Sequence, residues 1–364
     1  MFDLIVVGGG VAGSYLASQI KGRNKVLLIE RKKEIIPKDS GIVSTRFNLL
    51  FGKNGQRFIK NEITRMDCVS PIGKTFSLSS EQPFAYILRR EKFEEELRKN
   101  AAKKAEIVYA NTSGVRFFHD HVSVKTDQGE YHAKLVAGCD GAGSVVRNAM
   151  GVEKPKTALG IMVKTKTRLE GNIQVFFNKY YSPDFFSWVI PQNNEYGLMT
   201  AIRPGDYANY FVRDMYLPAG KMYAYQIPYT YTKSYANRAV LVGDACGQNK
   251  PLTGGGIMFS MIGAGHAARI INDALEMNKT NAQFLSFYEK YWKKELAWEI
   301  EKQFMLRMVY RKLTNKEIDD MFVDFGPIFS TLNGFDYDKL SGLWKGFPKM
   351  RLVKFILGKL PRMI

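Results

Sequence analysis

The chain has 364 residues, of which 45% are hydrophobic and 13% aromatic, so it has the material for about two globular domains and is not disordered. The spacing of its three cysteines, Cys68, Cys139 and Cys246, matches neither a zinc site nor a disulfide framework. Because its four histidines also form no metal-ligand pattern, we expect no metal. The formal net charge of +18 predicts an anionic partner, and because no nucleic-acid module is visible we expect no nucleic acid.

The start of the chain bears on its location. A predicted strand begins at Phe2, which leaves no room for a signal peptide. The apolar stretches are interrupted by glycines before they reach the length of a membrane span. We therefore expect a cytoplasmic protein that associates with membranes only peripherally.

The opening segment predicts a buried strand, a glycine-rich turn and a helix. Residues 2–7 are a nearly continuous aliphatic run, typical of a parallel strand that is buried on both faces. Gly8 permits a tight turn, Gly10 lets the backbone approach a pyrophosphate, and Gly13 lets a helix at 14–20 pack closely on the strand. The N–H groups at the start of that helix would then face the phosphates of a dinucleotide.

The next predicted strand ends in an acid. Residues 25–29 form a second aliphatic run, and Glu30 follows at the distance expected for hydrogen bonds with an adenosine ribose. A lone glycine pattern also fits a merely structural turn, but strand, glycines, helix, strand and acid in this order favour a dinucleotide site. The unit does not distinguish FAD from NAD.

Later segments favour FAD. Residues 86–93 lead into a helix with one apolar face, and residues 135–141 form another buried strand that ends in Asp-Gly. Residues 239–245 repeat the strand-into-acid pattern, so Asp244 is placed to bind the ribityl hydroxyls of a flavin. The helix after residues 251–257 starts from glycines, and its positive end would favour the negative charge of the reduced flavin ring.

Six motifs spread over about residues 1–330 occur together in one known family. The motifs are Gly8 to Gly13, Arg90 to Phe93, Asp140-Gly141, Gly243 to Ala245, Pro251 to Ile257, and Phe186-Ser187-Trp188-Val189-Ile190-Pro191 followed by Gly197. With them the chain resembles the geranylgeranyl reductase family, within the flavoprotein superfamily that includes aromatic hydroxylases of the p-hydroxybenzoate type and flavin halogenases. The resemblance implies an α/β fold: a Rossmann-type FAD-binding domain with an inserted antiparallel β-sheet substrate domain and a C-terminal helical segment.

The resemblance also implies the residues of the site. The residues expected to bind FAD are Gly8, Gly10, Ala12, Gly13, Glu30, Arg31, Ser40, Gly41, Arg90, Asp244, Gly254, Gly255, Gly256 and Ile257. The residues expected to bind substrate are Phe186, Trp188 and Pro191, which would border a lipid tunnel next to the flavin. Asp39 and Trp188 are the candidates for catalysis.

The implied activity is the FAD-dependent reduction of C=C bonds in geranylgeranyl chains of membrane ether lipids or their precursors. An isolated alkene has no carbonyl to polarise it, so hydride transfer from the flavin must be coupled to protonation of the second carbon. Many family members carry a cysteine where this chain has Asp39. As a hypothesis, Asp39 donates or relays the proton if burial favours its protonated form, and the alternative is a loop-capping or helix-capping aspartate.

Two other functions stay open on the sequence. An FAD-dependent monooxygenase or halogenase would use the same fold, and Ile190-Pro191 is close to the halogenase pattern although Phe186 stands where halogenases usually have tryptophan. A non-catalytic lipid carrier or membrane scaffold would retain FAD for structure only. The electron donor is also open between NAD(P)H and ferredoxin, because no second dinucleotide turn is visible.

A change of pattern predicts the domain organisation. In residues 151–234 the alternation of predicted strands and helices gives way to strand-like segments rich in aromatic residues. Either these aromatic residues are present only because they favour β-sheets, or they line an apolar cavity for a long hydrocarbon. The expected domains are an FAD-binding domain at 1–65, 85–150 and 235–275, a substrate domain at 66–84 and 151–234, and a C-terminal helical region at 276–364.

The C-terminal segment predicts a membrane contact. After Asp338 no acidic residue occurs, while lysines and arginines alternate with apolar residues that fall on one helical face. We expect this basic amphipathic tail to bind an anionic membrane surface, and the alternative is a helix that packs on the protein core with solvated lysines.

Overall fold

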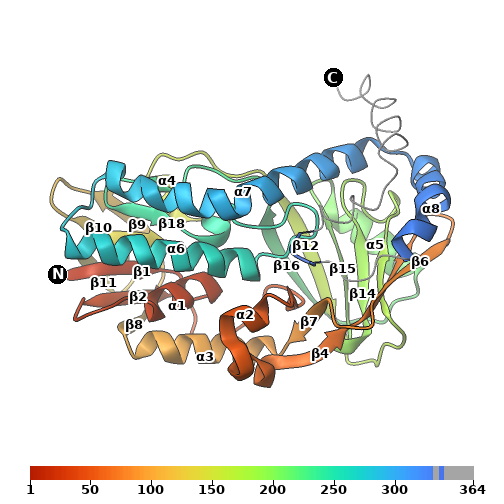
Figure 1. Cartoon of the computed structure of the whole chain (residues 1–364), viewed down its shortest axis with the longest axis horizontal. Helices are drawn as coiled ribbons and strands as arrows, with labels where there is room; N and C mark the ends of the chain where they lie inside the picture. Colours follow the sequence, from red (N-terminus) through yellow and green to blue (C-terminus); the bar gives the residue numbers. More distant parts are fainter. Residues whose placement is uncertain (331–335, 340–364) are drawn as a thin grey trace.

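A computed structural model of the chain describes residues 1–330 and 336–339, and the strands of these residues form three sheets. Figure 1 shows an eight-stranded sheet with its helices in one half of the molecule and a seven-stranded sheet in the other half. The long helix α7 (Ala282–Lys312) runs along both halves. The mixed α/β architecture predicted from the sequence is confirmed.

Five neighbouring parallel strands form the centre of the eight-stranded sheet, in the order β18-β11-β1-β2-β8. The aliphatic run at the start of the chain forms the central strand β1, whose side chains from Leu4 to Val7 are buried because both faces of the sheet are covered. The eight strands are β1 (Phe2–Val7), β2 (Val26–Glu30), β8 (Ala105–Tyr109), β9 (Thr112–Phe117), β10 (Val122–Thr126), β11 (Gly129–Gly138), β17 (Tyr235–Ala236) and β18 (Ala239–Leu241).

Helices cover one face of this sheet and build the largest core cluster. Leu4, Val6 and Leu28 of the sheet belong to the same buried cluster as Phe259 and Trp292, which come from α6 and α7. These helices are α1 (Val11–Ser18), α3 (Arg90–Ala102), α6 (Ile257–Glu276) and α7. The short α4 (Val145–Ala149) lies beside β9 and β11 and packs through Val146 against Ile5 and Val7, on the other face. The first helix begins at Val11, three residues before the predicted start, because Gly10 already serves as its N-cap.

The turn from β1 into α1 requires glycine at two positions. Gly8 has a φ of +99°, and a Cβ atom there would lie 2.4 Å from the carbonyl oxygen of Cys139. A Cβ atom on Gly13 would lie 1.9 Å from the carbonyl oxygen of Gly8. Glycine at position 8 therefore lets the turn pass the backbone at Cys139, and glycine at position 13 lets the helix pack directly on the turn.

The seven-stranded sheet has the order β16-β12-β15-β14-β13-β5-β6. It is antiparallel except for β13 and β5, which are parallel, and this differs from the all-antiparallel sheet expected. The reason is connectivity, since β5 comes from a stretch far earlier in the chain and no hairpin joins it to β13. The strands are β5 (Arg65–Val69), β6 (Thr75–Ser79), β12 (Thr157–Lys164), β13 (Ile173–Phe176), β14 (Ser187–Ile190), β15 (Glu195–Thr200) and β16 (Lys221–Pro228), with η2 (Pro191–Asn193) and α5 (Pro204–Asp214) between them.

A three-stranded sheet, β3-β7-β4, carries the loop that precedes β3. Its core contains Phe47, Phe58 and Phe93, whose rings meet in edge-on contacts 5.4 to 5.5 Å apart. Its elements are β3 (Ile42–Ser44), α2 (Phe47–Phe51), η1 (Gly52–Phe58), β4 (Ile59–Ile63) and β7 (Ala85–Leu88). This packing holds the loop at residues 38–41 next to α3.

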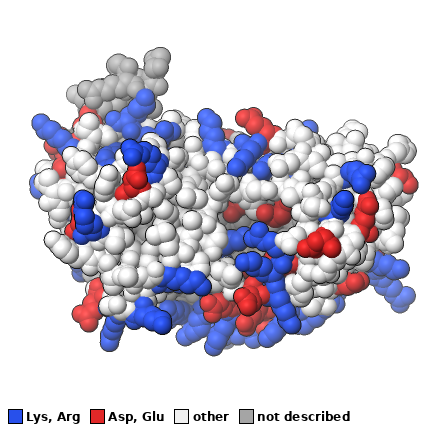
Figure 2. Space-filling view, turned by 180° about the vertical axis from the view of Figure 1, so that it is seen from behind, with Lys and Arg blue, Asp and Glu red and all other residues white. Residues whose placement is uncertain are grey.

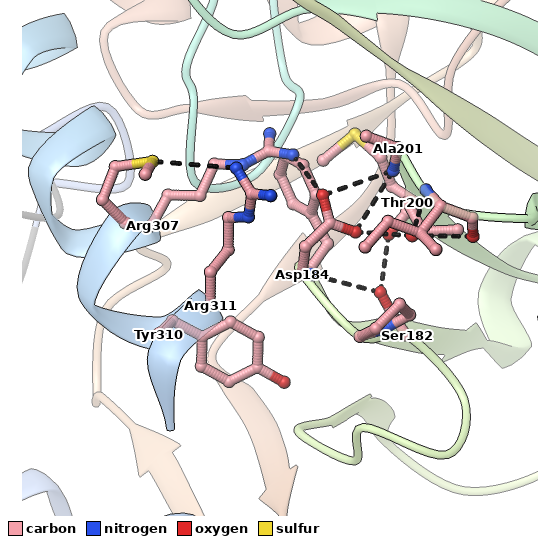
Figure 3. A network of polar contacts seen from close by, with 12 residues as sticks. Ser182, Asp184, Thr200, Ala201, Arg307, Tyr310 and Arg311 are labelled. Carbon is pink, nitrogen blue, oxygen red and sulfur yellow. Dashed lines mark hydrogen bonds and ion pairs between the residues drawn. The ribbon is translucent and has the colours of Figure 1, made fainter. Parts of the chain in front are cut away.

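A buried ion pair joins α7 to the seven-stranded half. Arg307 donates from Nη2 to Asp184 Oδ2 over 2.8 Å, and both side chains are only 1% exposed. Asp184 also accepts hydrogen bonds from the Thr200 hydroxyl and the Ala201 N–H, as Figure 3 shows. The guanidinium lies over the ring of Phe185, 3.2 Å from its centroid. These contacts fix the helix across the two halves.

The remaining described helix is α8 (Asn315–Ser330), and the predicted basic tail after Asp338 lies outside the described residues except for Lys339. Among the helices within residues 1–330, none has the length and apolar character needed to cross a membrane. Figure 2 shows Lys and Arg side chains scattered over one face and gathered along its lower edge, with acidic side chains among them.

Candidate active site

Two adjoining cavities lie between the eight-stranded and seven-stranded sheets. The larger is about 680 Å³ and is lined by the β1–α1 turn, the end of β2, the start of α3 and the start of α6. The smaller is about 220 Å³ and mostly apolar, with walls from both the seven-stranded sheet and the residue 38–42 loop. The residues that line both are Lys38, Asp39, Tyr225, Ile227, Gly254 and Ile257. A ligand in the larger cavity would therefore reach the apolar one.

Glu30 ends β2 beside the glycine-rich turn. Its Oε2 accepts the N–H of Gly9 over 2.6 Å, and its Oε1 accepts the N–H of Lys32 over 3.0 Å. The acid thus holds the turn to the end of the strand while it lines the larger cavity. This is the position from which an acid meets an adenosine ribose in dinucleotide folds.

Several buried polar atoms of the larger cavity have no hydrogen-bond partner within the described chain. They are Arg90 Nη1, Arg98 Nε and Asp140 Oδ1, and all three residues line the cavity. Buried donors and acceptors are normally paired, so these atoms indicate a polar ligand with both donors and acceptors. The residues present fit FAD, whose phosphates, hydroxyls and ring edges offer such partners.

Asp244 follows β18 within the short helix η3 (Gly243–Ala245) and lines the same cavity. Burial raises the pKa of its carboxyl, while Lys38 opposes that rise, and Asn249 donates to Oδ1 over 3.1 Å. The start of α6 lies close by, with Gly256 as its N-cap and no side chain capping its first N–H groups. The site therefore places both an acid and a helix N-terminus at the junction of the two cavities.

Asp39 belongs to the loop between the cavities. Its Oδ1 accepts the N–H of Gly41 over 2.8 Å and lies 3.0 Å from Arg90 Nε, in an ion pair. Gly41 has a φ of +72°, and a Cβ there would come within 2.5 Å of the Arg90 side chain. These contacts are those of the loop-capping alternative that the sequence left open for Asp39.

The apolar cavity is walled by the aromatic motif of β14. Trp188 and Phe186 line it, with their rings in an edge-on contact 6.1 Å apart. A Cβ on Gly197 would lie 2.6 Å from the Trp188 ring, so glycine is required for the indole to lie against β15. The sequence therefore identified two side chains of this wall, Phe186 and Trp188. The structure adds why the motif is followed by glycine at position 197.

Most of the predicted site residues line one of the two cavities. The larger cavity has Gly8, Gly10, Ala12, Glu30, Arg31, Arg90, Asp244, Gly254, Gly256 and Ile257, and the apolar cavity has Ser40, Gly41, Gly255, Phe186 and Trp188. Two residues lie outside both linings. Gly13 packs behind the turn against Gly8, and Pro191 starts the turn η2, where its fixed φ suits the first helical position.

Sequence reasoning missed Glu195, the first residue of β15, which is fully buried beside Trp188. The Ser40 hydroxyl donates to Glu195 Oε1. Burial raises the pKa of Glu195 to about 6, against the opposing effects of Ser40 and the nearby Lys164. An acid that begins a strand predicted to be buried, two residues before Gly197, is the signal that could have singled it out.

Tyr337 is a second residue that the sequence did not reveal. It lines the apolar cavity and lies next to Asp338, whose buried Oδ1 is 2.9 Å from Lys250 Nζ. The Ser44 hydroxyl donates to Asp338 Oδ2 over 2.5 Å. The ion pair therefore fixes a residue from far along the chain as part of the cavity wall.

No cluster of His, Cys, Asp and Glu side chains suited to a metal ion occurs among residues 1–330 and 336–339. The chemistry of the donor set is that of a dinucleotide site: backbone N–H groups, arginines and single acids spread along one elongated cavity.

Comparison with known proteins agrees with this geometry. The chain is 26% identical to the digeranylgeranylglycerophospholipid reductase of Methanocaldococcus jannaschii, over 93% of each chain. Its fold is similar to that of a geranylgeranyl bacteriochlorophyll reductase-like protein of Thermoplasma acidophilum, with a TM-score of 0.84, 21% identity and coverage of 100% and 99%. It is also similar to p-nitrophenol 4-monooxygenase of Pseudomonas putida, with a TM-score of 0.69, 16% identity and coverage of 90% and 95%.

These two structural likenesses show the fold alone, because one fold serves both a reductase-like protein and a monooxygenase. The family assignment rests on the sequence profile of the FAD binding domain family, which matches residues 1–229. This match includes the glycine-rich turn, Glu30, Arg90 and the aromatic motif around Trp188. The chain belongs to the FAD binding domain family, and FAD is the cofactor that its larger cavity fits.

Proposed function

We propose that the chain is an FAD-dependent reductase that saturates C=C bonds in geranylgeranyl chains of membrane ether lipids or their precursors. The observation that carries the proposal is the apolar cavity of about 220 Å³ that joins the dinucleotide cavity through shared wall residues. The name of the Methanocaldococcus jannaschii relative supports it.

The volume of the apolar cavity bears on how a geranylgeranyl chain would bind. A cavity of about 150 Å³ in an apolar protein core holds a benzene ring. The apolar cavity here therefore has room for at least one five-carbon isoprene unit, while the rest of a geranylgeranyl chain would extend through the opening. Such a site would bring one double bond at a time to the flavin.

The chain's own residues would hold and orient the reactants. Gly8, Gly10 and the start of α1 would meet the pyrophosphate, Glu30 the adenosine ribose, and Asp244 the ribityl hydroxyls. The chemistry that FAD would supply when held and reduced there is hydride donation to an alkene carbon. Phe186 and Trp188 would exclude water and hold the alkene in a reactive position.

The decisive experiment is anaerobic. We expect that mixing the photoreduced protein with a geranylgeranyl ether lipid restores the oxidised flavin spectrum, with a product heavier by two hydrogens for each bond reduced. The fully saturated lipid serves as the control and should leave the flavin reduced. A requirement for oxygen together with a hydroxylated or halogenated product would instead establish the monooxygenase or halogenase alternative.

The electron donor in the proposal is NAD(P)H or a ferredoxin, which binds from outside the FAD site. Anaerobic mixing of the oxidised protein with NADPH, NADH or a reduced ferredoxin would distinguish them by the rate at which the flavin is bleached. If none of them reduces the flavin, both candidates are wrong.

We also propose peripheral binding to an anionic membrane through the basic segment after Asp338. This segment carries seven lysines and arginines and no acidic residue. We expect the full chain to sediment with vesicles that contain phosphatidylglycerol and to stay in solution with phosphatidylcholine alone or at high salt. Equal binding to both kinds of vesicle would contradict an electrostatic contact.

A further inference from the structure

The side chain of Glu195 lies on the cavity side of the seven-stranded sheet. Glu195 is paired across the strands with Ile190 of β14 and Lys164 of β12. Directly opposed residues share one face of an antiparallel sheet, and Ile190 lines the apolar cavity. The carboxyl thus lies on the cavity face of the sheet, fully buried behind the residues that line the cavity.

Ser40 connects this carboxyl to the cavity. Ser40 lines the apolar cavity, and its hydroxyl contacts Glu195 Oε1. The N–H of Trp188 lies near enough to lower the pKa of Glu195, but neither Trp188 Nε1 nor Glu195 Oε2 completes a hydrogen bond with any described residue. Burying such a carboxyl costs free energy, because one oxygen is hydrogen-bonded only to a serine hydroxyl and the other has no partner among the described residues. This cost indicates a functional role for Glu195.

We infer that Glu195 and Ser40 form a proton relay into the apolar cavity, in which Ser40 protonates the alkene and Glu195 restores the serine proton. The inference rests on the proposed function and deepens it, because it names the proton source for the second alkene carbon. Ser40 is the catalytic residue of the pair, and Glu195 acts through it as a positioning residue and proton reservoir.

The step balances in protons and electrons. In the structure the Ser40 hydroxyl donates to Glu195 Oε1. Once Glu195 is protonated, this hydrogen bond reverses: the carboxyl O–H donates to the Ser40 oxygen, and the Ser40 O–H turns into the cavity. The hydride of the reduced cofactor forms one C–H bond and supplies both electrons, while the Ser40 O–H bond breaks to form the other. The proton of Glu195 moves to the serine oxygen, which leaves a glutamate carboxylate that is reprotonated from water after the product leaves.

The surroundings of Glu195 suit this use near neutral pH. Burial is the main influence on its carboxyl and favours the protonated form, and the nearby charge of Asp39 acts in the same direction. Ser40, Trp188 and Lys164 act in the opposite direction, and Lys60 of β4 adds a further positive charge nearby. The resulting pKa of about 6 means that the donor is present below pH 6 and is progressively lost as the pH rises.

Asp39 differs from Glu195 in its partners. Its carboxylate already accepts the Gly41 N–H and pairs with Arg90, so its oxygens are used to fix the loop that carries Ser40. Asp39→Asn is therefore the comparison variant that separates the two candidate donors. If Asp39 only anchors the loop, this variant changes the rate without removing its dependence on pH.

The test measures anaerobic single-turnover reoxidation of the reduced holoenzyme by a geranylgeranyl ether lipid, from about pH 5 to 8. We expect Glu195→Gln and Ser40→Ala to slow this step by about 100-fold or more, the usual contribution of a positioned proton donor. The fall in rate above pH 6 should disappear in Glu195→Gln. Ser40→Thr keeps the hydroxyl and should retain the rate within about tenfold.

A second readout needs no turnover. The infrared band of a protonated carboxyl should titrate with a midpoint near pH 6 in the wild-type protein and be missing in Glu195→Gln. Thermal unfolding and the flavin spectrum confirm that each variant is folded and loaded.

The outcomes separate the relay from the proposed function. If Glu195→Gln keeps the wild-type rate and pH profile, or if Asp39→Asn alone abolishes the pH profile, the proton relay is wrong. The proposed reductase function is unaffected by either result. If the wild-type protein itself fails to oxidise its flavin with the alkene, the proposed function is overturned and the relay with it.

Discussion

Gly10→Ala is expected to weaken FAD binding by about 100-fold, which corresponds to about 2.7 kcal/mol, without destabilising the protein that lacks FAD. A Cβ atom on Gly10 would meet no protein atom within 4 Å, and the residue lines the larger cavity. The added methyl group would therefore clash only with a pyrophosphate that approaches the turn. Fluorescence titration of the apoprotein with FAD and urea unfolding of the apoprotein measure the two quantities.

Gly13→Ala is the matched comparison, because its Cβ would lie 1.9 Å from the Gly8 carbonyl oxygen. This backbone contact cannot be relieved by moving a side chain, so Gly13→Ala should destabilise even the apoprotein. If Gly10→Ala binds FAD as tightly as the wild type, the pyrophosphate does not lie over this turn.

Arg307→Met is expected to lower the free energy of unfolding by about 3–5 kcal/mol. The substitution removes the buried partner of Asp184 and leaves its carboxylate in a site that is only 1% exposed. The hydrogen bonds from Thr200 and Ala201, seen in Figure 3, remain but carry no neutralising charge. Urea unfolding followed by circular dichroism measures the loss.

Arg311→Met serves as the control, since Arg311 is exposed on the same helix and its loss should change the stability by less than about 0.5 kcal/mol. The double variant Asp184→Asn with Arg307→Met should recover part of the loss, because no charge is then left buried. An Arg307→Met protein as stable as the control would show that the ion pair does not hold α7 in place.

The dinucleotide half of the site could be predicted because its parts are local in sequence. The strand β1, the glycines and the helix α1 follow one another directly, and Glu30 ends the next strand along the chain. Local spacing determines such a unit, since the turn, the helix start and the strand end are set by neighbouring residues. Asp244 and the start of α6 were identified for the same reason.

The apolar cavity was predicted only in outline. The aromatic motif of β14 indicated Phe186 and Trp188, but periodicity does not say which strand lies beside which. The parallel pairing of β5 with β13 was therefore not expected, and Pro191 was assigned to a wall that its neighbour Ile190 forms.

By itself, the sequence determined the α/β class, the FAD binding domain family and most of the residues that line the larger cavity, because short-range patterns of glycines, aliphatic runs and single acids specify them. Only the tertiary structure decided the partners of the buried charges. Ser40 meets Glu195 across 155 positions, and Arg307 meets Asp184 across 123. Such pairs depend on how sheets and helices pack, and no local pattern encodes which carboxyl a distant side chain will reach.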